Sequence, residues 1–174
     1  PSDDEITMLM LGAMPLAAHP NPERIAIIGW GSGLSTHTVL GSGKPLQVDS
    51  IEIERAMYDG AMLFGPRVER AYRDPRSRLH IDDARTFFST GSRRYDVIVS
   101  EPSNPWVSGV ASLFTRQFYA FLGNHLKDDG ILVQWIHTYE LSDPLLMTML
   151  AALSAEYPYI EMYRPNYGDL VLLA

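Results

Sequence analysis

The 174-residue sequence contains no cysteine, few basic residues and no long apolar run. The absence of cysteine excludes disulfides, thiolate nucleophiles and cysteine-ligated metals. Lysine and arginine together number 14 against 21 acidic residues, a formal net charge of −7. Nucleic acid is therefore disfavoured as a main partner, because phosphate binding needs a basic face. No apolar stretch reaches the roughly 18 residues of a membrane span, and no signal peptide is visible.

What the chain does contain is the composition of a globular domain, with 46% hydrophobic and 20% charged residues. It begins at Pro1 rather than methionine and ends in an apolar, strand-like run at 170–174. We expect a domain excised from a longer protein. Its expected location is cytoplasmic, either free or as the soluble part of a membrane-anchored parent.

Two groups of polar residues are expected to be solvated or structural. Five arginines cluster in sequence and are expected on a solvated helix and loop: Arg67, Arg70, Arg73, Arg76 and Arg78. The histidines have no metal-ligand spacing, so we expect no metal and assign them as structural or surface residues: His19, His37, His80, His125 and His137.

Apolar runs of strand length alternate with helix-like segments along most of the chain. Strands are expected at 25–28, 46–53, 78–81, 95–100 and 131–136. Helices are expected at 5–18, 34–41, 56–64, 84–89, 113–126 and 143–156, with a turn at 128–130. Such alternation predicts a parallel sheet with helices on both faces. We divide the chain into an N-terminal helical segment, 1–22, and a Rossmann-like domain, 23–174.

The end of the chain refines this fold prediction. Residues 160–163 and 170–173 flank Asn166-Tyr-Gly168 and are expected to form an antiparallel pair. A closing hairpin is typical of the class I methyltransferase variant, whereas a dinucleotide fold ends with another crossover helix. The predicted fold is therefore α/β, with a doubly wound, mostly parallel seven-stranded sheet that closes with an antiparallel hairpin.

A glycine-rich loop follows the first expected strand. It reads Gly29-Trp30-Gly31-Ser32-Gly33. Glycine lets the backbone approach a ligand closely. The third glycine of a dinucleotide fingerprint would fall at position 34, which is leucine, so the spacing disfavours NAD. We expect residues 29–33 to bind an adenosyl cofactor without a pyrophosphate.

Two acidic residues end the next two strands. Glu52 lies 19 positions after Gly33 and can reach a ribose in the crevice, with Ile53 beside it. Asp83 is either the N-cap of a helix at 84–89 or a hydrogen-bond acceptor for an adenine amine. Because the glycine loop and Glu52 already indicate an adenosyl site, we favour adenine contact by Asp83 and Ala84.

The loops after strands four and five supply the candidate reactive groups. Glu101 could act as a base or orient an amine, and Asn104 could hydrogen-bond a substrate. Trp106 could form an aromatic wall of the substrate pocket; the alternative is a rigid proline loop with Trp106 in the core. Tyr139 and Glu140 are further pocket candidates, while Trp135 is expected in the core.

These motifs together resemble the spermidine/spermine synthase family over roughly residues 20–140. The resemblance also includes Tyr95-Asp-Val-Ile-Val, Leu113-Phe-Thr-Arg-Gln-Phe-Tyr119 and Gly130-Ile-Leu-Val-Gln134. Two further stretches are similar to bacterial spermidine-synthase-like domains that are often fused to membrane segments: Glu101-Pro-Ser-Asn-Pro-Trp106 and Ala111-Ser-Leu-Phe-Thr115.

The resemblance implies a class I methyltransferase fold and transfer of an aminopropyl group from decarboxylated S-adenosylmethionine to an amine such as putrescine. Methylthioadenosine would be the product, and a homodimer is common in the family. Carried over, Gly29, Gly31 and Gly33 would surround the sulfur-bearing chain of the cofactor. Glu52 would bind the ribose and Asp83 with Ala84 the adenine, and Glu101 stands at the place of the family's catalytic aspartate.

Two positions depart from the family pattern. Ser32 stands where the family has an aspartate for the cofactor amine, and Asn104 replaces a carboxylate of the catalytic loop. Two alternatives therefore stay open beside aminopropyl transfer. One is an S-adenosylmethionine-dependent methyltransferase, because Asn104-Pro105-Trp106 resembles the Asn-Pro-Pro-Tyr loop of amine methyltransferases. The other is a non-catalytic nucleoside-binding domain of a larger membrane protein.

Overall fold

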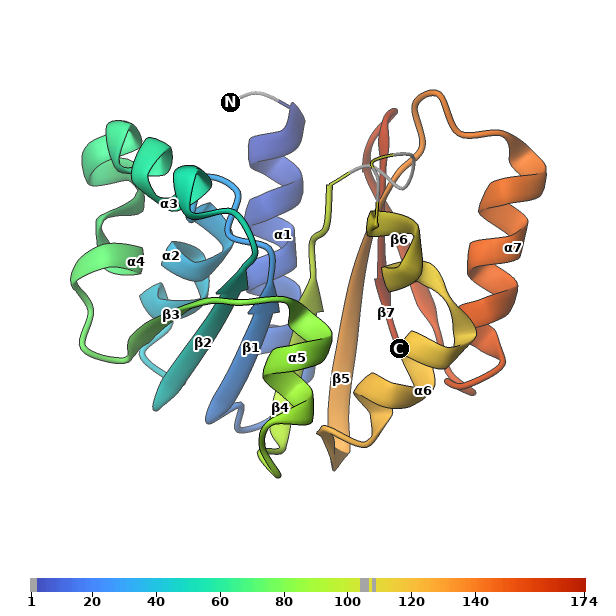
Figure 1. Cartoon of the computed structure of the whole chain (residues 1–174), viewed down its shortest axis with the longest axis horizontal. Coiled ribbons are helices and arrows are strands. Elements are labelled where there is room, and N and C mark those ends of the chain that lie inside the picture. Colours follow the sequence, from blue (N-terminus) through green and yellow to red (C-terminus); the bar gives the residue numbers. More distant parts are fainter. Residues whose placement is uncertain (1–2, 104–106, 108) are drawn as a thin grey trace.

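One seven-stranded sheet with helices on both faces organises the protein (Figure 1). A computed structural model describes residues 3–103, 107 and 109–174. The strands are β1 Arg24–Ile28, β2 Gln47–Glu52, β3 Ser77–Ile81, β4 Tyr95–Ser100, β5 Leu126–His137, β6 Glu161–Asn166 and β7 Asp169–Leu173. The helices are α1 Asp3–Ala18, α2 Leu34–Gly41, α3 Arg55–Ala61, α4 Glu69–Arg73, α5 Ala84–Ser89, α6 Arg116–Gly123 and α7 Asp143–Ser154, with 3₁₀ segments η1 Met62–Val68 and η2 Val110–Phe114.

The strand order is β3-β2-β1-β4-β5-β7-β6. The first five strands are parallel, and β7 runs antiparallel to both β5 and β6. This arrangement confirms the predicted fold, including the closing hairpin. The order reverses direction at β1, so the crevice above β1 and β4 is where a ligand is expected in an open α/β sheet.

The alternation of side chains along β1 divides the core into two layers. Ile25 and Ile27 pack with Leu11 of α1 and with α2, whereas Ala26 and Ile28 pack toward α5, α6 and α7. Successive residues of a strand point to opposite faces of the sheet, and a strand covered on both faces is apolar throughout. Figure 1 accordingly shows α1 and α5 on opposite sides of the sheet.

Helix α1 is part of this packing. Leu11 and Leu16 are buried, and the Thr7 hydroxyl donates to the Asp169 carboxylate of β7 at 2.6 Å. The division of the chain at residue 22 stays a prediction. Among the described residues, no helix has both the length and the apolar character needed to cross a membrane.

Three predicted boundaries were wrong. The helix expected at 56–64 ends at Ala61 and continues as η1, where Gly65 has a φ of +57°. The helix expected at 113–126 is interrupted at Thr115, whose extended backbone and side chain cap α6. The turn expected at 128–130 is a bulge within β5, between the pairs Tyr95–Leu126 and Val97–Ile131.

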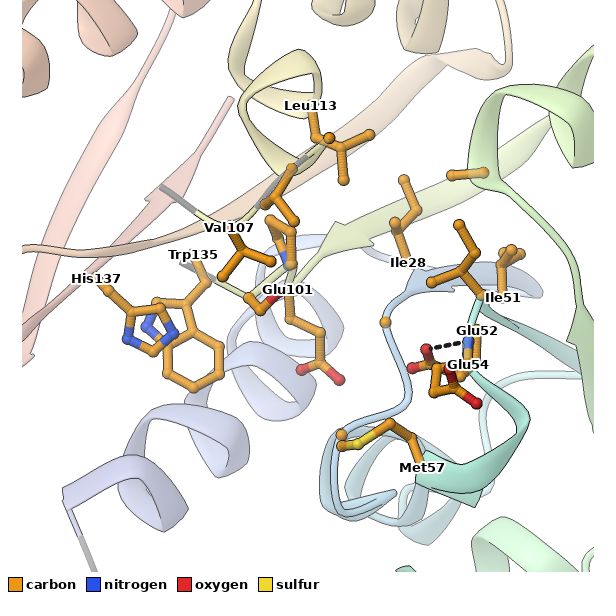
Figure 2. Close-up of a pocket in the computed structure, with 18 of the residues that line it drawn as sticks. Ile28, Ile51, Glu52, Glu54, Met57, Glu101, Val107, Leu113, Trp135 and His137 are labelled. Atoms are coloured by element: carbon orange, nitrogen blue, oxygen red, sulfur yellow. Dashed lines mark hydrogen bonds between the residues drawn. The ribbon is translucent and has the colours of Figure 1, made fainter. Parts of the chain in front are cut away.

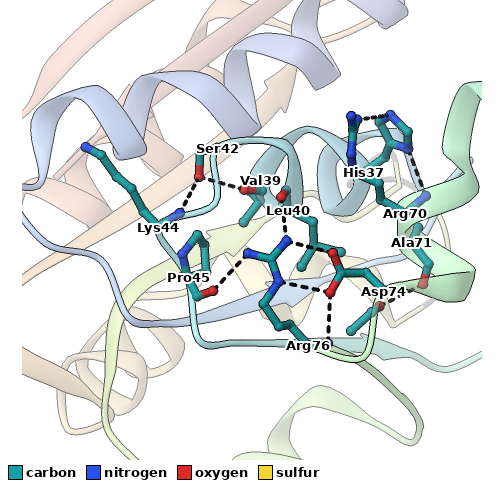
Figure 3. Close-up of polar contacts among 11 residues, drawn as sticks. His37, Val39, Leu40, Ser42, Lys44, Pro45, Arg70, Ala71, Asp74 and Arg76 are labelled. Atoms are coloured by element: carbon teal, nitrogen blue, oxygen red, sulfur yellow. Dashed lines mark hydrogen bonds and ion pairs between the residues drawn. The ribbon is translucent and has the colours of Figure 1, made fainter.

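The arginine cluster divides into two groups. Arg67 and Arg73 are exposed, as predicted, but Arg76 is not a solvated residue (Figure 3). Its guanidinium pairs in a bidentate manner with Asp74, at 2.6 and 2.9 Å. It also donates to the carbonyls of Leu40, at 2.8 Å, and Pro45, at 3.1 Å. Arg76 therefore joins the end of α2 and the approach to β2 to the start of β3.

Candidate functional site

A cavity of about 710 Å³ opens at the carboxyl ends of strands β1 to β5. Its volume lies within the usual range for small-molecule sites. Figure 2 shows Glu101 in the middle of the view, with Trp135 and His137 on one side and Glu52 and Met57 on the other. The pocket thus lies where the strand order reverses, as the predicted fold requires.

The glycine loop forms one wall of the pocket. Gly29, Gly31 and Gly33 have φ values of +96°, +49° and +80°, a region that favours glycine. A Cβ at Gly29 would lie 2.5 Å from the Glu101 carbonyl oxygen. Gly29, Gly31 and Ser32 line the cavity, and the Ser32 hydroxyl contacts the Met8 sulfur at 3.2 Å.

Two predicted cofactor residues in this loop, Trp30 and Gly33, have structural contacts, and their contact with a cofactor stays a prediction. The Trp30 ring is buried against Tyr58 and Tyr72, with ring centroids 5.2 and 5.3 Å away, and does not line the pocket. Gly33 precedes α2, and a Cβ there would lie 3.3 Å from the Trp30 ring. Both residues stand at loop positions where ligand contact is expected, but the left-handed turn places them against the core.

Glu52 is held at the end of β2 by the backbone around it. Its Oε2 accepts from the Trp30 amide and its Oε1 from the Glu54 amide, each at 2.9 Å. Each carboxylate oxygen has a second lone pair, so the group can still accept two ribose hydroxyls. Ile53 beside it is exposed and lines the pocket. Glu54 follows the end of β2 and caps α3.

Asp83 is the N-cap of α5, since its carboxylate accepts from the Thr86 amide at 3.0 Å. It also lines the pocket with Ala84. The capping role is therefore shown, and adenine contact stays a prediction. Asp82, which the sequence prediction passed over, lines the same wall.

Glu101 is the most perturbed acid of the pocket. Its carboxylate is almost fully buried and accepts a hydrogen bond from the Ser35 hydroxyl at 2.5 Å. Burial raises the pKa of Glu101 to about 8, and the nearby charge of Glu52 adds to this, while the Ser35 hydrogen bond opposes it. With this pKa, Glu101 is mostly the neutral acid near neutral pH.

Strand β5 contributes more to the pocket than predicted. Trp135 is buried as expected but also lines the cavity, as does His137, which we had assigned as structural or surface. Tyr139 lines the cavity as predicted. Glu140 is exposed, has a φ of +58° and does not line the cavity formed by the described residues, so its role at the site stays a prediction. The signal that was missed is alternation within β5, which places Trp135 and His137 on the same face of the strand.

The loop after β4 is described only in part. Asn104 and Trp106 lie outside the described residues. Of their neighbours, Pro102, Ser103 and Val107 line the pocket. Helix α1 adds Asp4 and Met8, which nothing in the sequence placed near the glycine loop.

Among the described residues, one group of a histidine and two aspartates lies close enough together to be considered as a metal site. His19 Nε2 lies 3.6 Å from Asp129 and 4.0 Å from Asp96. The Asn21 amide donates to His19 Nδ1 at 3.2 Å, so the ring proton is on Nε2 and that atom has no lone pair for a metal. Lys127 also lies 2.7 Å from Asp96. His19 keeps its structural assignment.

The fold and the position of the pocket define an α/β protein of class I methyltransferase-like architecture. Within this class the chain belongs to the family described as the spermine/spermidine synthase domain, whose model matches residues 5–169.

Curated relatives and solved structures agree with the family. The chain is 31% identical to a polyamine aminopropyltransferase of Nitrosomonas europaea, over 92% of this chain and 50% of the relative. It is 26% identical to the Bacillus subtilis polyamine aminopropyltransferase, over 94% of this chain and 59% of the relative. The chain therefore spans little more than half the length of these relatives.

Among solved structures, a spermidine synthase in complex with the transition-state analogue AdoDATO has a TM-score of 0.87 at 21% identity, covering 98% of this chain and 60% of that one. The spermidine synthase of Thermotoga maritima has a TM-score of 0.83 at 22% identity, with coverages of 98% and 59%. Human methyltransferase-like protein 13 in complex with SAH has a TM-score of 0.74 at 21% identity, with coverages of 98% and 79%. At these identities the similarity shows the fold.

Proposed function

We propose that this chain is the cofactor-binding and catalytic domain of an aminopropyltransferase. It binds decarboxylated S-adenosylmethionine, transfers the aminopropyl group to a small amine and releases methylthioadenosine. The observation that carries the proposal is the pocket itself, where the glycine loop, Glu52 and the buried Glu101 converge at adjacent strand ends. Family membership and relatives named polyamine aminopropyltransferase support the same reaction.

The cofactor is expected to lie across the carboxyl ends of β1, β2 and β3. Glu52 accepts from the ribose hydroxyls, which its remaining lone pairs allow. Asp83, Ala84, Gly29 and Gly31 line the pocket. The proposal assigns the first two to the adenine and the two glycines to the sulfur-bearing chain. Full S-adenosylmethionine would use the same contacts, so the nucleoside contacts alone do not select the transferable group.

Catalysis in this site is mostly positioning, because a sulfonium is already an activated leaving group. The acceptor nitrogen attacks the carbon next to sulfur, and the electrons of the breaking C–S bond go to sulfur, which becomes a neutral thioether. Glu101 supplies a carboxylate at the reacting end. A bound cation favours its ionised form, so cofactor binding is expected to lower the pKa of Glu101 below about 8.

The partner is a small amine, and nucleic acid is not expected because the chain has a net charge of −7. We also propose that two copies of the chain form a homodimer, as the family resemblance implies. Sedimentation of the purified chain measures this oligomeric state directly. A cytoplasmic site of action fits a polyamine substrate and is proposed with it.

The first experiment is a calorimetric titration with S-adenosylmethionine, its decarboxylated form and methylthioadenosine. We expect the decarboxylated form to bind more tightly than the full cofactor. Putrescine and other unbranched diamines are then added, and methylthioadenosine release is followed by mass spectrometry. Preference for the full cofactor with methyl transfer to an amine would contradict the proposal, and so would binding of none of the three nucleosides.

A further inference from the structure

Asp169 is a buried carboxylate behind the wall of the pocket, surrounded by hydrogen-bond donors. It accepts from Thr7 Oγ1 at 2.6 Å, Asn166 Nδ2 at 2.7 Å, Trp135 Nε1 at 2.9 Å and His137 Nδ1 at 3.1 Å. These donors come from α1, β6 and β5. Asp169 and His137 are direct partners in the antiparallel pairing of β7 with β5.

Asp169 is held in its charged form. Burial acts to raise its pKa, but the hydrogen bonds from His137, Thr7, Asn166 and Trp135 outweigh burial and hold the pKa well below its ordinary value. A charged carboxylate at Nδ1 selects the tautomer in which Nδ1 carries the proton. The lone pair of neutral His137 is then on Nε2, on the other side of the ring.

The His137 ring is held in one orientation at the pocket. It packs against Trp135, with ring centroids 4.3 Å apart, and against Tyr139, with centroids 5.4 Å apart. His137, Trp135, Tyr139 and Glu101 all line the same cavity, and Figure 2 shows the His137 ring beside Trp135, on one side of Glu101. Among the residues that the structure describes, none hydrogen-bonds to His137 Nε2.

Glu101 is placed for a different task. Glu101 is the residue that directly follows β4. Its carboxylate contacts Ser35 in α2, and Gly29 of the glycine loop packs on its backbone carbonyl. These contacts orient it toward the side of the pocket formed by the glycine loop and Glu52. His137 lies on the other side of Glu101, beside Trp135, and this is the side that we assign to the acceptor amine.

We propose that His137, oriented by the buried Asp169, takes the proton from the attacking amine of the acceptor, so that Glu101 is left to balance the positive charge of the cofactor. This assignment rests on the proposed aminopropyl transfer. In the step, the N–C bond forms, the C–S bond breaks with its electrons going to sulfur, and the N–H proton goes to His137 Nε2. Asp169 stabilises the imidazolium that results, and it acts as a positioning residue.

The test uses the full chain with His137→Ala, Asp169→Asn and, as a histidine outside the pocket, His37→Ala. Methylthioadenosine binding is measured by calorimetry, and transfer from decarboxylated S-adenosylmethionine to putrescine is measured from pH 5.5 to 9.5. For His137→Ala we expect nucleoside binding within about threefold of the parent and kcat lowered about 10²- to 10⁴-fold. Added imidazole should restore part of the kcat, a rescue that a merely structural role would not show.

The pH profile is the second readout. The groups around the His137 ring that can titrate are Asp169 from β7, Glu101 after β4 and Tyr139, and Asp4 of α1 lines the same pocket. The rise in kcat assigned to the proton acceptor should vanish in His137→Ala and remain in His37→Ala. Asp169→Asn should lower kcat about 10- to 10³-fold, because an amide can donate to Nδ1 and select the wrong tautomer. Thermal unfolding of each variant verifies that it is folded.

The outcomes separate the two proposals. If the unsubstituted chain binds the nucleoside but transfers to no amine, the proposal of aminopropyl transfer is overturned, and the role of His137 with it. A parent chain that transfers, while folded His137→Ala keeps its kcat and pH profile, overturns the role of His137 alone.

Discussion

At the scale of single residues, Glu52 has a structural role, and we propose that the same side chain binds the ribose. Its two oxygens accept from the amides of Trp30 and Glu54 and so set the shape of the glycine loop before a ligand binds. A glutamine would present an NH₂ group to one of these amides, which leaves two donors facing each other.

We therefore expect Glu52→Gln to weaken methylthioadenosine binding at least about tenfold, since it loses a charge-assisted acceptor and disturbs the loop. The control is Glu69→Gln, an exposed glutamate of α4 that does not line the pocket. Calorimetric titration of both variants checks the prediction. Equal affinities for the two variants would show that Glu52 does not contact the ribose.

Glu101 links the reaction to the stability of the fold. The pKa of Glu101 is about 8 in the folded chain against 4.5 for an unperturbed group. Between these two pH values the folded state therefore keeps a proton that the unfolded state has lost. The free energy of unfolding must then fall as the pH rises from about 4.5 through 8.

Glu101→Gln removes this penalty. We expect the variant and the parent to be similarly stable at pH 5, and the variant to be more stable by on the order of 5 kcal/mol at pH 9. Urea unfolding at pH 5, 7 and 9 measures the difference, with Glu54→Gln as the exposed-carboxylate control. Parallel pH profiles for parent and Glu101→Gln would contradict the buried-acid assignment.

At the scale of elements, the short connections between strands determine where the site residues lie. The glycine loop between β1 and α2 passes within contact of the Glu101 backbone, and this close approach sets the distance between two walls of the pocket. Gly29 and Gly31 provide a comparison, because both have positive φ but only Gly29 is crowded.

We expect Gly31→Ala to cost about 1 kcal/mol of stability, from backbone conformation alone. Gly29→Ala should cost more than about 2 kcal/mol and displace Glu101, because its Cβ would also collide with a backbone carbonyl. Thermal unfolding and methylthioadenosine titration of both variants test this difference. Equal losses in the two variants would mean that the crowding at Gly29 relaxes freely.

A second connection depends on Arg76, which joins α2, β2 and β3 through Asp74 and two carbonyls (Figure 3). The hydrogen bond from Arg76 is the main cause that holds the pKa of Asp74 below its ordinary value. A lysine keeps the charge but cannot form the planar, bidentate pair and reach both carbonyls.

Arg76→Lys should therefore cost about 1–3 kcal/mol in the free energy of unfolding. Arg73→Lys is the control, because Arg73 and Glu69 form an exposed i,i+4 pair worth at most about 0.5 kcal/mol. Chemical denaturation of both variants gives the comparison. A cost for Arg76→Lys no larger than that of the control would show that the three elements are joined without it.

At the scale of the whole molecule, α1 covers one face of the sheet and also reaches the pocket. Leu11 and Leu16 pack in the layer with Val97, Val99 and Val133, and Thr7 bonds to Asp169. Without α1 this apolar layer would face water, at a cost of roughly 25 cal/mol for each square ångström exposed.

We expect a variant that lacks residues 1–22 to lose cooperative thermal unfolding and to bind a dye for exposed apolar surface. The double variant Leu9→Ala, Ile6→Ala alters exposed positions of the same helix and should stay cooperative. Unchanged unfolding of the shortened chain would instead support 23–174 as a complete domain.

Much of the fold was predictable because it depends on local patterns. Apolar runs at β1 and β4, the left-handed glycine turn and the closing hairpin each leave a signature within a few residues of sequence. The helix boundaries near Gly65 and Thr115 were missed because 3₁₀ segments carry the same apolar spacing as the α-helix that was expected.

The sequence by itself determined the class of fold, the glycine loop and the positions of Glu52 and Glu101 at strand ends. These follow from side-chain period, glycine conformation and chain order, all of which are local. Only the tertiary structure decided that Trp30 packs in the core, that α1 reaches the pocket, and that Asp169 holds His137. The last pair is 32 residues apart and meets only because β7 inserts beside β5, so the contact is created by non-local strand pairing.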